Sequence, residues 1–452
     1  TPLVVDGVIF TTEPPDDVLA LDVRTGRKLW SYQHRLPSKL PLCCGRVNRG
    51  LAMTGSTLYL GTLDAHLVAV DAGSGDVKWD VEVADPAQGY SITGAPLAFG
   101  QMVVIGVSGG EFGARGLLAA YDTRNGRKLW QFDTVPSPGS PGSETWKSDA
   151  WRNGGGPTWM TGSYDPSAHL LYWGVGNPSP VYVGDLRPGD NLFTDSVLAL
   201  QPETGKLVWH FQFSPHDEHD WDSNQTPVLA DLPVKGTPRK LMLWANRNGF
   251  YYVLDRVTGE FLGATPFVRQ NWAERIDARG RPVLSAAGRV SERGSLTYPG
   301  IGGGTNWQAV AFDPRLNYFL VQATEGSSVY TKSAPDLVRH VTGELYVGSG
   351  NESVSPVTAV VRALDAVSGE KVWEYLSPET RHLGSSGLLA TEGGLVFGCS
   401  GGEMFAVDSH TGREGWRMFL GGRTVAAPIS VDIDGRQTIL VAAGRALFAL
   451  GL

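Results

Sequence analysis

Residues 67–79, LVAVDAGSGDVKW, contain the motif that decides the fold of this chain. Asp71 is followed by two residues, a serine, Gly75 and, four residues later, Trp79, with an alternating apolar run on each side. A turn signal between two such runs predicts a β-hairpin with the glycine in its tight turn. The same pattern occurs at Asp22-Gly26-Trp30, Asp122-Gly126-Trp130, Asp365-Gly369-Trp373 and Asp408-Gly412-Trp416, with variants at Gln201-Gly205-Trp209 and Asp255-Gly259.

The spacing of these copies indicates the architecture. Gly205 and Gly259 lie 54 residues apart, and Gly369 and Gly412 lie 43 apart, which is close to the length of one four-stranded propeller blade. We assign a degenerate copy near Val341-Thr342-Gly343 to the widest gap in the series, which brings the count to eight. The sequence therefore predicts an all-β fold, an eight-bladed β-propeller with tryptophan-docking repeats that forms a single domain.

In a propeller each blade packs only on its neighbours, so a domain over residues 1–452 can exceed the usual size of one core. The 58 glycines suit its many turns. The repeat alone places the motif tryptophans between blades, with no role in chemistry: Trp30, Trp79, Trp130, Trp373 and Trp416.

Both ends of the chain resemble blade strands. Thr1-Pro2-Leu3 is similar to the strand start at Ala95-Pro96-Leu97. We therefore expect the chain to begin inside a blade, with a signal peptide and a first strand absent from it. The apolar runs at residues 440–442 and 447–449 are expected to help close the ring.

Charge and hydropathy argue against two classes of partner. The formal net charge is -8, and no run of lysine and arginine offsets it, which argues against a nucleic-acid surface. No apolar stretch approaches the roughly 18 residues of a membrane-spanning helix. We expect a soluble globular protein with no nucleic-acid partner and no membrane span.

Cys43 and Cys44 are adjacent in the sequence. Consecutive Cα atoms lie about 3.8 Å apart across a trans peptide, which is shorter than the usual disulfide separation of roughly 4.4 to 6.8 Å, so a bond between them would be strained and uncommon. The residues alone leave two interpretations open, a pair of free thiols or a vicinal disulfide. Cys399 lies in a late strand and is expected to be an inert core residue.

Several segments resemble the quinoprotein alcohol dehydrogenases, the family of bacterial methanol and ethanol dehydrogenases that use pyrroloquinoline quinone (PQQ). They are CCGRVNRG at 43–50, SGGEFGARG at 108–116, WGVGNP at 173–178, HDEHDWD at 216–222 and ANRNG at 245–249. The resemblance extends over nearly the whole chain. It implies a disulfide between Cys43 and Cys44 against one face of the quinone and Trp159 stacked on the other face.

The resemblance also implies the other site residues. Asp220 matches the catalytic base, which is also a metal ligand, and Arg247 matches the arginine that contacts this aspartate and the quinone. Glu111 and Asn177 match metal ligands. The remaining matches to the cofactor site are Arg49, Thr93, Ser108, Gly109, Gly110 and Asn306.

Oxygen donors dominate the implied metal site. Glu111, Asn177, Asp220 and Asp222 supply hard ligands, which suit a hard cation and not zinc or copper. Lanthanide-using members of the family carry an extra aspartate two positions after the catalytic one, where Asp222 stands. Because an added carboxylate favours a trivalent ion, we expect a lanthanide rather than Ca2+. The alternative is that Asp222 is a solvated loop residue.

These features together predict a periplasmic PQQ-dependent alcohol dehydrogenase that oxidises small primary alcohols to aldehydes. The cation would polarise the quinone carbonyl, Asp220 would take the hydroxyl proton and hydride would pass to the quinone. The sequence has no Cys-x-x-Cys-His haem motif, so a separate soluble cytochrome c is the expected electron acceptor. An oxidising compartment would also permit the disulfide.

Other interpretations stay open. A quinoprotein acting on polyols, sugars or polymeric alcohols is one, and a non-catalytic propeller scaffold such as an outer-membrane assembly lipoprotein is another; a homodimer is left open as well. Val181 stands where methanol dehydrogenases have a tryptophan that narrows the substrate pocket, so we expect ethanol or longer alcohols to be better substrates than methanol. Near Ser385, where the family has a tryptophan close to the cofactor, this chain has no equivalent ring.

Overall fold

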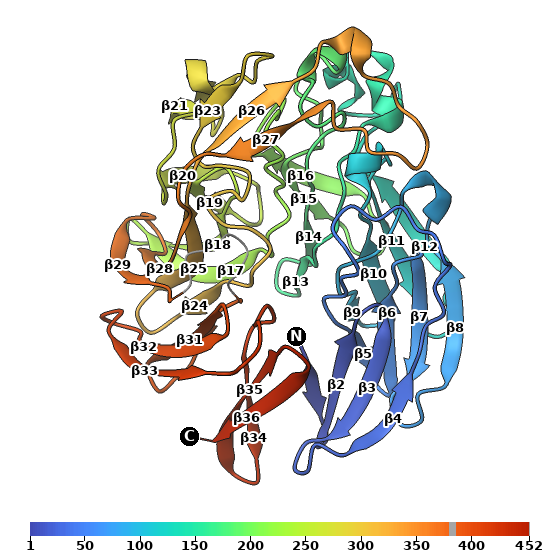
Figure 1. Ribbon diagram of the computed structural model, residues 1–452, viewed down its shortest axis with the longest axis vertical. Helices are drawn as coiled ribbons and strands as arrows, with labels where there is room; N and C mark the ends of the chain where they lie inside the picture. The colour runs from blue at the N-terminus through green and yellow to red at the C-terminus, as the bar shows by residue number, and fades with distance from the viewer. Residues whose placement is uncertain (379–385, 452) are drawn as a thin grey trace. The chain divides into compact units, whose positions relative to one another are not determined.

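The computed structural model describes residues 1–378 and 386–451, so the position of Ser385 lies outside the described residues. The chain divides into two compact units. The first unit contains Pro2–Asn224 and Thr331–Gly350, and the second contains Gln225–Tyr330 and Asn351–Leu452, together with Thr1. Figure 1 colours the chain from blue at the N-terminus to red at the C-terminus.

In the described part of the first unit, four four-stranded antiparallel sheets pair their strands in sequence order. The first contains β1 (Leu3–Val5), β2 (Val8–Glu13), β3 (Asp17–Asp22) and β4 (Lys28–Tyr32). The second contains β5 (Ala52–Thr54), β6 (Thr57–Gly61), β7 (His66–Asp71) and β8 (Val77–Glu82). The third contains β9 (Leu97–Phe99), β10 (Met102–Gly106), β11 (Leu117–Asp122) and β12 (Lys128–Asp133). The fourth contains β13 (Ser163–Asp165), β14 (Leu170–Gly174), β15 (Ser196–Leu200) and β16 (Leu207–Gln212).

The second unit repeats this pattern in its described residues. One four-stranded sheet contains β17 (Val228–Val234), β18 (Thr237–Ala245), β19 (Phe250–Asp255) and β20 (Phe261–Pro266). The next contains β24 (Ala311–Asp313), β25 (Tyr318–Glu325), β28 (Thr358–Asp365) and β29 (Lys371–Leu376). A third contains β30 (Leu389–Ala390), β31 (Leu395–Ser400), β32 (Glu403–Asp408) and β33 (Glu414–Phe419). A three-stranded sheet of β34 (Ile429–Ile433), β35 (Arg436–Ala443) and β36 (Ala446–Gly451) includes both apolar runs that were expected to be strands.

The remaining elements are short. β21 (Ala273–Ile276) pairs with β22 (Pro282–Leu284), and β23 (Ser295–Thr297) pairs with β26 (Ser328–Lys332). β26 and β27 (Ser349–Ser353) stand where the chain passes between the two units. The 3-10 helices are η1 (Pro86–Gln88), η2 (Gly110–Phe112), η3 (Ser143–Thr145), η4 (Asp149–Asn153), η5 (Gly184–Leu186), η6 (Ala286–Gly288) and η7 (Pro335–Leu337). None of the helices in the described residues has the length and apolar character needed to cross a bilayer. The predicted all-β fold is confirmed.

The aspartate and glycine of the motif form the hairpin turns. In the second sheet, the Asp71 carboxylate accepts hydrogen bonds from the backbone N–H groups of Gly73 at 2.9 Å and Ser74 at 3.1 Å. Gly75 has a φ of 81° and donates its N–H to the Asp71 carbonyl at 2.9 Å. Glycine takes this left-handed conformation without the steric cost of a Cβ atom. The predicted hairpin is therefore present with its glycine in the turn.

The tryptophan of one motif docks on the turn of the next. The indole N–H of Trp30 donates to the carbonyl of Ala72 at 3.0 Å. A Cβ atom built on Gly75 would lie 2.7 Å from Cε3 of Trp30, so the turn glycine also leaves room for the ring. The same indole-to-carbonyl hydrogen bond joins Trp79 to Thr123, Trp130 to Pro202 and Trp373 to Ser409. Docking is confirmed for these four tryptophans.

Trp416 is the exception. Its side chain is 39% exposed, although the repeat predicts that it is wedged between blades. The sheet that follows it in the sequence, β34 to β36, has Asp434-Gly435 in its first turn but no copy of the Asp-x-x-Thr/Ser/Asn-Gly motif. The following sheet therefore offers this ring no motif turn of the kind on which Trp30 docks.

The degenerate copy assigned near Val341-Thr342-Gly343 is wrong. Residues 333–348 contain no β-strand, and Gly343 lies in an irregular segment with a φ of 78°. The segment lacks the alternating apolar runs that supply the two strands of every true hairpin, so its glycine forms only a turn. The wide gap between Gly259 and Gly369 holds the two-stranded sheet of β21 and β22, the three-stranded sheet of β23, β26 and β27, and three strands of the four-stranded sheet that ends with β29.

The core lies between sheets that are neighbours in the sequence. Leu60 of the second sheet is buried against Phe10 of the first, whereas Leu67 on the other face packs with Val103 of the third. The second sheet is therefore covered on both faces, which explains why its middle strands β6 and β7 are almost continuously apolar. Cys399 is buried in an equivalent core of the second unit, and burial raises the pKa of its thiol to about 11, as expected for an inert core residue.

Candidate functional site

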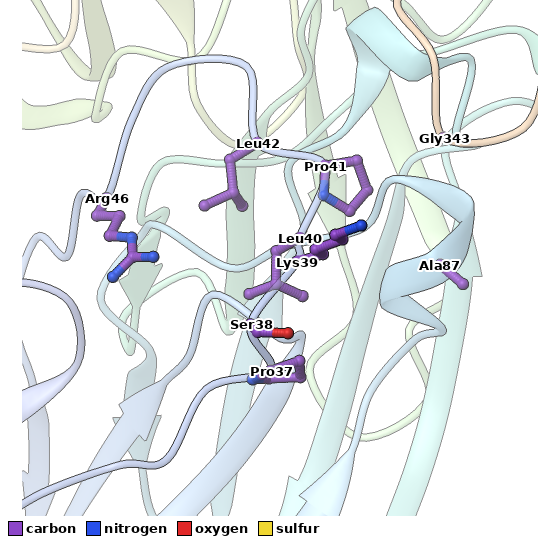
Figure 2. Close-up of a pocket in the computed structure, with 9 residues that line it drawn as sticks. All are labelled: Pro37, Ser38, Lys39, Leu40, Pro41, Leu42, Arg46, Ala87 and Gly343. Carbon is purple, nitrogen blue, oxygen red and sulfur yellow. The ribbon is translucent and has the colours of Figure 1, made fainter.

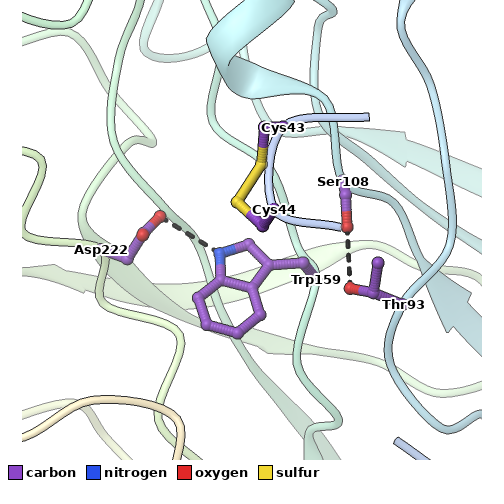
Figure 3. Close-up of a disulfide and its surroundings, with 6 residues drawn as sticks. All are labelled: Cys43, Cys44, Thr93, Ser108, Trp159 and Asp222. Atoms are coloured by element: carbon purple, nitrogen blue, oxygen red, sulfur yellow. Dashed lines mark hydrogen bonds between the residues drawn. A yellow bond between two sulfur atoms is a disulfide. The ribbon is translucent and has the colours of Figure 1, made fainter. Parts of the chain in front are cut away.

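The paired cysteines lie in the irregular segment of residues 33–51 that joins β4 to β5. Cys43 and Cys44 are bonded to each other, with their Cα atoms 3.8 Å apart, and both are exposed. The vicinal disulfide that the family resemblance implied is therefore present. Figure 3 shows this disulfide and the side chains in its surroundings, including Trp159.

Hydrogen bonds at the end of this segment fix it to the neighbouring sheets. The side-chain amide of Asn48 donates to the Asp16 carboxylate at 2.9 Å. Arg49 donates its backbone N–H to the Thr93 carbonyl at 3.1 Å and its Nη1 to the same oxygen at 3.3 Å. The Thr93 hydroxyl in turn shares a 3.0 Å hydrogen bond with the Ser108 hydroxyl. Three predicted cofactor residues from separate segments are thus neighbours (Figure 3 draws the last two).

Arg49 and Trp159 are in contact. The guanidinium carbon of Arg49 lies 4.8 Å from the centroid of the Trp159 ring, which is a cation–π geometry. Burial lowers the pKa of Arg49 to about 10, although the negative charge of Asp222 opposes that effect. The guanidinium stays protonated at neutral pH. A fixed positive charge beside an aromatic face suits a planar, anionic cofactor.

Asp222 connects this pair to the predicted metal ligands. Its Oδ1 accepts hydrogen bonds from the Trp159 indole N–H at 3.2 Å, the Asn177 backbone N–H at 3.2 Å and the Asn224 side-chain amide at 3.3 Å. Figure 3 shows the first of these bonds. Asp222 is only 4% exposed. The alternative that it is a solvated loop residue is therefore wrong.

Asn177 offers a ligand atom. The residue is fully buried, and its Nδ2 donates to the Pro178 carbonyl at 3.2 Å. Its Oδ1 has no hydrogen-bond partner among the residues that the structure describes. A buried amide oxygen without a donor is rare in native proteins, and it is a ligand that a hard cation takes. The local geometry fits the predicted metal-binding role.

Glu111 lies in η2, beside the disulfide. Its carboxylate oxygen and the sulfur atoms of Cys43 and Cys44 lie within 4.8 Å of one another. Disulfide sulfur is a poor ligand for a hard cation, so this closeness places the carboxylate at the disulfide rather than defining a sulfur site. The backbone carbonyl of Glu111 accepts the N–H of Tyr346 at 2.6 Å, so the segment 331–350 holds η2 in place.

Gly109 and Gly110 are required by packing. Gly109 has a φ of 122°, and a Cβ atom built on it would lie 2.4 Å from the carbonyl oxygen of Gly89. A Cβ atom on Gly110 would lie 2.8 Å from Cδ of Pro157. Close packing explains both glycines, and their predicted contact with a cofactor stays a prediction.

Asp220, the predicted base, lies in an irregular loop that is held from both sides. The Asp217 carboxylate accepts the backbone N–H groups of His219 and Trp221, each at 3.1 Å. The rings of His219 and Trp221 stack with their centroids 4.2 Å apart. Asp220 has a φ of 63°, a conformation that costs a non-glycine residue about 1 to 3 kcal/mol and persists only where its surroundings enforce it.

Arg247 and Asn306 belong to the second unit. Arg247 is 6% exposed, and its Nη2 donates to the Ile301 carbonyl at 2.8 Å. Its backbone carbonyl accepts the N–H of Gly304 at 2.8 Å, and the Asn306 side chain donates to the Gly302 carbonyl at 3.1 Å. The arginine and the glycine-rich segment are thus neighbours, while their contacts with a quinone stay predictions.

Two polar residues near the predicted ligands were missed by sequence reasoning. Asn224 donates to Asp222 and has an Oδ1 without a partner among the described residues; its position two residues after Asp222 was the available signal. Asp195 is fully buried, and burial raises the pKa of its carboxyl well above the ordinary range, with repulsion from Asp217 and Asp222 adding to the effect. Nothing in its sequence context marks it as more than a loop residue before β15.

A pocket of about 450 Å³ lies beside the segment that leads to the disulfide (Figure 2). Its walls are Pro37, Ser38, Lys39, Leu40, Pro41, Leu42, Arg46, Ala87 and Gly343. None of the predicted site residues lines it.

Comparisons with known proteins agree with this geometry. Residues 1–266 match the family model described as glucose/ethanol/alcohol dehydrogenase, beta-propeller domain (PQQ), and residues 289–451 match the model of the outer membrane protein assembly factor BamB. The chain is 36% identical to quinoprotein alcohol dehydrogenase PedH of Pseudomonas putida, and the alignment covers 98% of this chain and 78% of that protein.

Two further relatives have informative names. The chain is 34% identical to the 1-butanol dehydrogenase (cytochrome c) of Thauera butanivorans, over 98% of this chain and 68% of that protein. The solved structure of a europium-containing methanol dehydrogenase superposes with a TM-score of 0.91 at 33% identity, covering all (100%) of this chain and 82% of that one.

Proposed function

Because this chain belongs to the PQQ-dependent quinoprotein alcohol dehydrogenases, we propose that it oxidises primary alcohols to aldehydes with a metal-bound PQQ. One observation carries the proposal: the Asp222 carboxylate joins the indole of Trp159 to Asn177, whose buried Oδ1 has no donor among the described residues. A stacking surface and a hard-ligand site thus share one carboxylate in the first unit.

The side chains divide into two groups by chemistry. Trp159 and the disulfide of Cys43 and Cys44 would cover the flat faces of the quinone, while Arg49 would face its carboxylates. Thr93 and Ser108 would bind its rim, with Gly109 and Gly110 close by, and Arg247 and Asn306 are the remaining proposed contacts. When bound, the quinone supplies a carbonyl carbon that accepts hydride, and the cation polarises that carbonyl.

Asp220 is the proposed general base. Its carboxylate would take the proton from the alcohol hydroxyl, and a base needs to be held within hydrogen-bond reach of that proton. The enforced backbone conformation of Asp220 and the two hydrogen bonds to Asp217 on either side of it support this role, because they keep the carboxylate in one place. Arg247 is the proposed partner of this carboxylate.

We favour a lanthanide over Ca2+ as the metal, bound by Glu111, Asn177, Asp220 and Asp222. The burial of Asp222 and its hydrogen bond to Asn177 support its inclusion among the ligands. A further carboxylate favours a trivalent ion over a divalent one. The europium-containing relative is consistent with this choice.

The remaining parts of the proposal concern the whole molecule. We propose an eight-bladed propeller over residues 1–452 as a single domain. Because the copy near Gly343 forms no strands, we assign the eighth blade to the three-stranded sheet of β34 to β36, in addition to the seven four-stranded sheets of the described residues. We also propose a periplasmic location and a separate cytochrome c as electron acceptor, the last supported by the name of the Thauera butanivorans relative. Val181 would widen the substrate pocket, so ethanol and longer alcohols would be better substrates than methanol. We favour small alcohols over polyols and sugars as the substrate class of this protein.

The test is a dye-linked assay of the protein with added PQQ and either La3+ or Ca2+, run on methanol, ethanol, 1-butanol and glycerol. We expect turnover of the primary alcohols with La3+, and loss of about 100-fold or more in Asp220→Asn, as for removal of a general base. Asp76→Asn, in an exposed hairpin turn of the second sheet, is the matched control. Absence of alcohol turnover with both ions, or full activity in Asp220→Asn, would contradict the proposal.

A further inference from the structure

Arg187 is an arginine whose guanidinium is fully buried in the first unit. It follows directly after η5. Its Nε donates to the Pro180 carbonyl at 3.0 Å and its Nη2 donates to the Val181 carbonyl at 2.9 Å. The same Nη2 donates to the Asp217 carbonyl in a short hydrogen bond. One rigid group therefore binds three backbone carbonyls from two separate loops.

These two loops carry the groups of the proposed reaction. Pro180 and Val181 follow Asn177 closely, and Val181 forms the proposed wall of the alcohol pocket. Asp217 is three residues before Asp220, and its side chain already fixes the backbone on both sides of that residue. The guanidinium thus spans from the substrate wall to the loop of the base.

Further hydrogen bonds strengthen this connection between the pocket wall and the loop of Asp220. The side-chain oxygen of Asn191 accepts the Nη1 of Arg187 at 3.0 Å, and the Asn191 amide donates back to the Arg187 carbonyl at 2.8 Å. The N–H of Gly184, at the start of η5, donates to the Glu218 carboxylate at 2.9 Å. η5 is therefore bound to the base loop at both of its ends.

We propose, on the basis of the function above, that Arg187 is a positioning residue that sets the distance between the alcohol pocket wall at Val181 and the loop of Asp220. A catalytic group displaced by about 1 Å loses roughly 100-fold in rate, so a connection of this kind affects kcat. Because it also places Val181, it affects discrimination between alcohols of different length.

The shape of the guanidinium matters more than its charge. Its planar fork carries donors in fixed directions, whereas a lysine ammonium is a compact charge on a flexible stem. The Arg187→Lys variant keeps the positive charge near Asp217 and Glu218 but lacks the fixed donors that bind the three carbonyls. A purely electrostatic role would survive this change, and a positioning role would not.

Two measurements on three variants test the inference. Arg187→Lys removes the planar guanidinium. Asn191→Ala removes both side-chain hydrogen bonds between Asn191 and Arg187 and leaves the three carbonyl bonds, and Arg27→Lys in an exposed hairpin turn is the control. In the protein without quinone, we expect hydrogen exchange of the peptide covering residues 214–224 to accelerate by about 10-fold in Arg187→Lys, less in Asn191→Ala and not in Arg27→Lys, because local protection depends on the bonds that hold a segment.

In the quinone-loaded protein, we expect kcat for ethanol to fall by about 10- to 100-fold in Arg187→Lys and by a few-fold in Asn191→Ala. The ratio of kcat/KM for 1-hexanol to that for ethanol should change at least about 3-fold in Arg187→Lys. Unchanged hydrogen exchange of residues 214–224 in Arg187→Lys would overturn the inference. The same holds for a loss of kcat/KM that is equal for both alcohols and is explained by the fall in thermal stability alone. Should Arg187→Lys fail to fold, Asn191→Ala decides by the same two measurements.

Failure of the positioning role can be distinguished from failure of the proposed alcohol dehydrogenase function. An unmodified protein without alcohol turnover would reject the function, while the exchange measurement would still report on the connection between η5 and residues 214–224. An active unmodified protein with an equally active Arg187→Lys variant would reject the positioning role alone.

Discussion

Gly75 and Gly26 occupy the same motif position but differ in what lies against them. Both have a left-handed backbone, with φ of 81° and 67°. A Cβ atom on Gly75 would lie 2.7 Å from Cε3 of Trp30, whereas a Cβ atom on Gly26 would have no atom within 4 Å. Substituting alanine at each position therefore separates the backbone cost from the cost of displacing a docked tryptophan.

The expected magnitudes follow from these two terms. A left-handed alanine costs about 1 to 2 kcal/mol, and the reduced entropy of the unfolded chain returns about 0.4 to 1 kcal/mol. Gly26→Ala should thus lower the free energy of unfolding by about 1 kcal/mol. Gly75→Ala adds overpacking, which costs about 1 to 3 kcal/mol, because the hydrogen bond from the Trp30 indole to Ala72 resists movement of the ring.

The assay is urea unfolding of both variants and of the pair combined with Trp30→Ala, followed by far-UV circular dichroism. We expect Gly75→Ala to unfold at a lower urea concentration than Gly26→Ala, and the difference to disappear in the Trp30→Ala background, since the coupling belongs to that contact. Equal midpoints for Gly75→Ala and Gly26→Ala would refute the docking of one blade on the turn of the next.

Three further predictions concern the site and its supporting segment. Asp222→Ser should weaken Tb3+ binding, measured by tryptophan-sensitised luminescence, by about 10-fold or more and Ca2+ binding by less, because the lost carboxylate matters most for a trivalent ion; equal loss for both ions would contradict this. Val181→Trp should lower kcat/KM for 1-butanol more than for methanol by at least about 10-fold, as expected when a pocket loses several methylene volumes; unchanged ratios would show that Val181 does not line the pocket. Burial alone would lower the pKa of His34, but the hydrogen bond that its Nε2 donates to the Asp64 carboxylate at 2.9 Å, together with the charge of that carboxylate, outweighs burial and raises the pKa. The stabilising effect of this pair is therefore complete below the ordinary imidazole pKa of about 6.5 and is lost as the pH rises through the raised pKa of His34. We expect the difference in urea midpoint between the unmodified protein and His34→Gln to become smaller as the pH is raised from about 5.5 to about 8.5.

The repeat could be interpreted from the sequence because its physics is local. An aspartate that binds the next backbone N–H groups, a glycine with positive φ and an alternating run on each side specify a hairpin without any distant contact, as at Asp71 and Gly75. The same locality explains the error near Gly343. A glycine turn without apolar runs on either side makes no blade, and counting glycines to fill a gap does not supply the missing strands.

The site residues came from a resemblance, and only the tertiary structure showed which of them meet. Trp159, Asn177 and Asp222 are separated by up to 63 residues in the sequence, yet one carboxylate oxygen accepts hydrogen bonds from the other two. The burial of Asp222 shows that it is not a solvated loop residue. Asp195 and Arg187 are also buried polar residues. Their local sequence gives no sign of this, because burial depends on the residues that pack around them. Sequence thus determined the hairpins, whose hydrogen bonds close within a few residues. Folding alone determined the polar cluster, since burial and long-range contacts exist only once the sheets have packed.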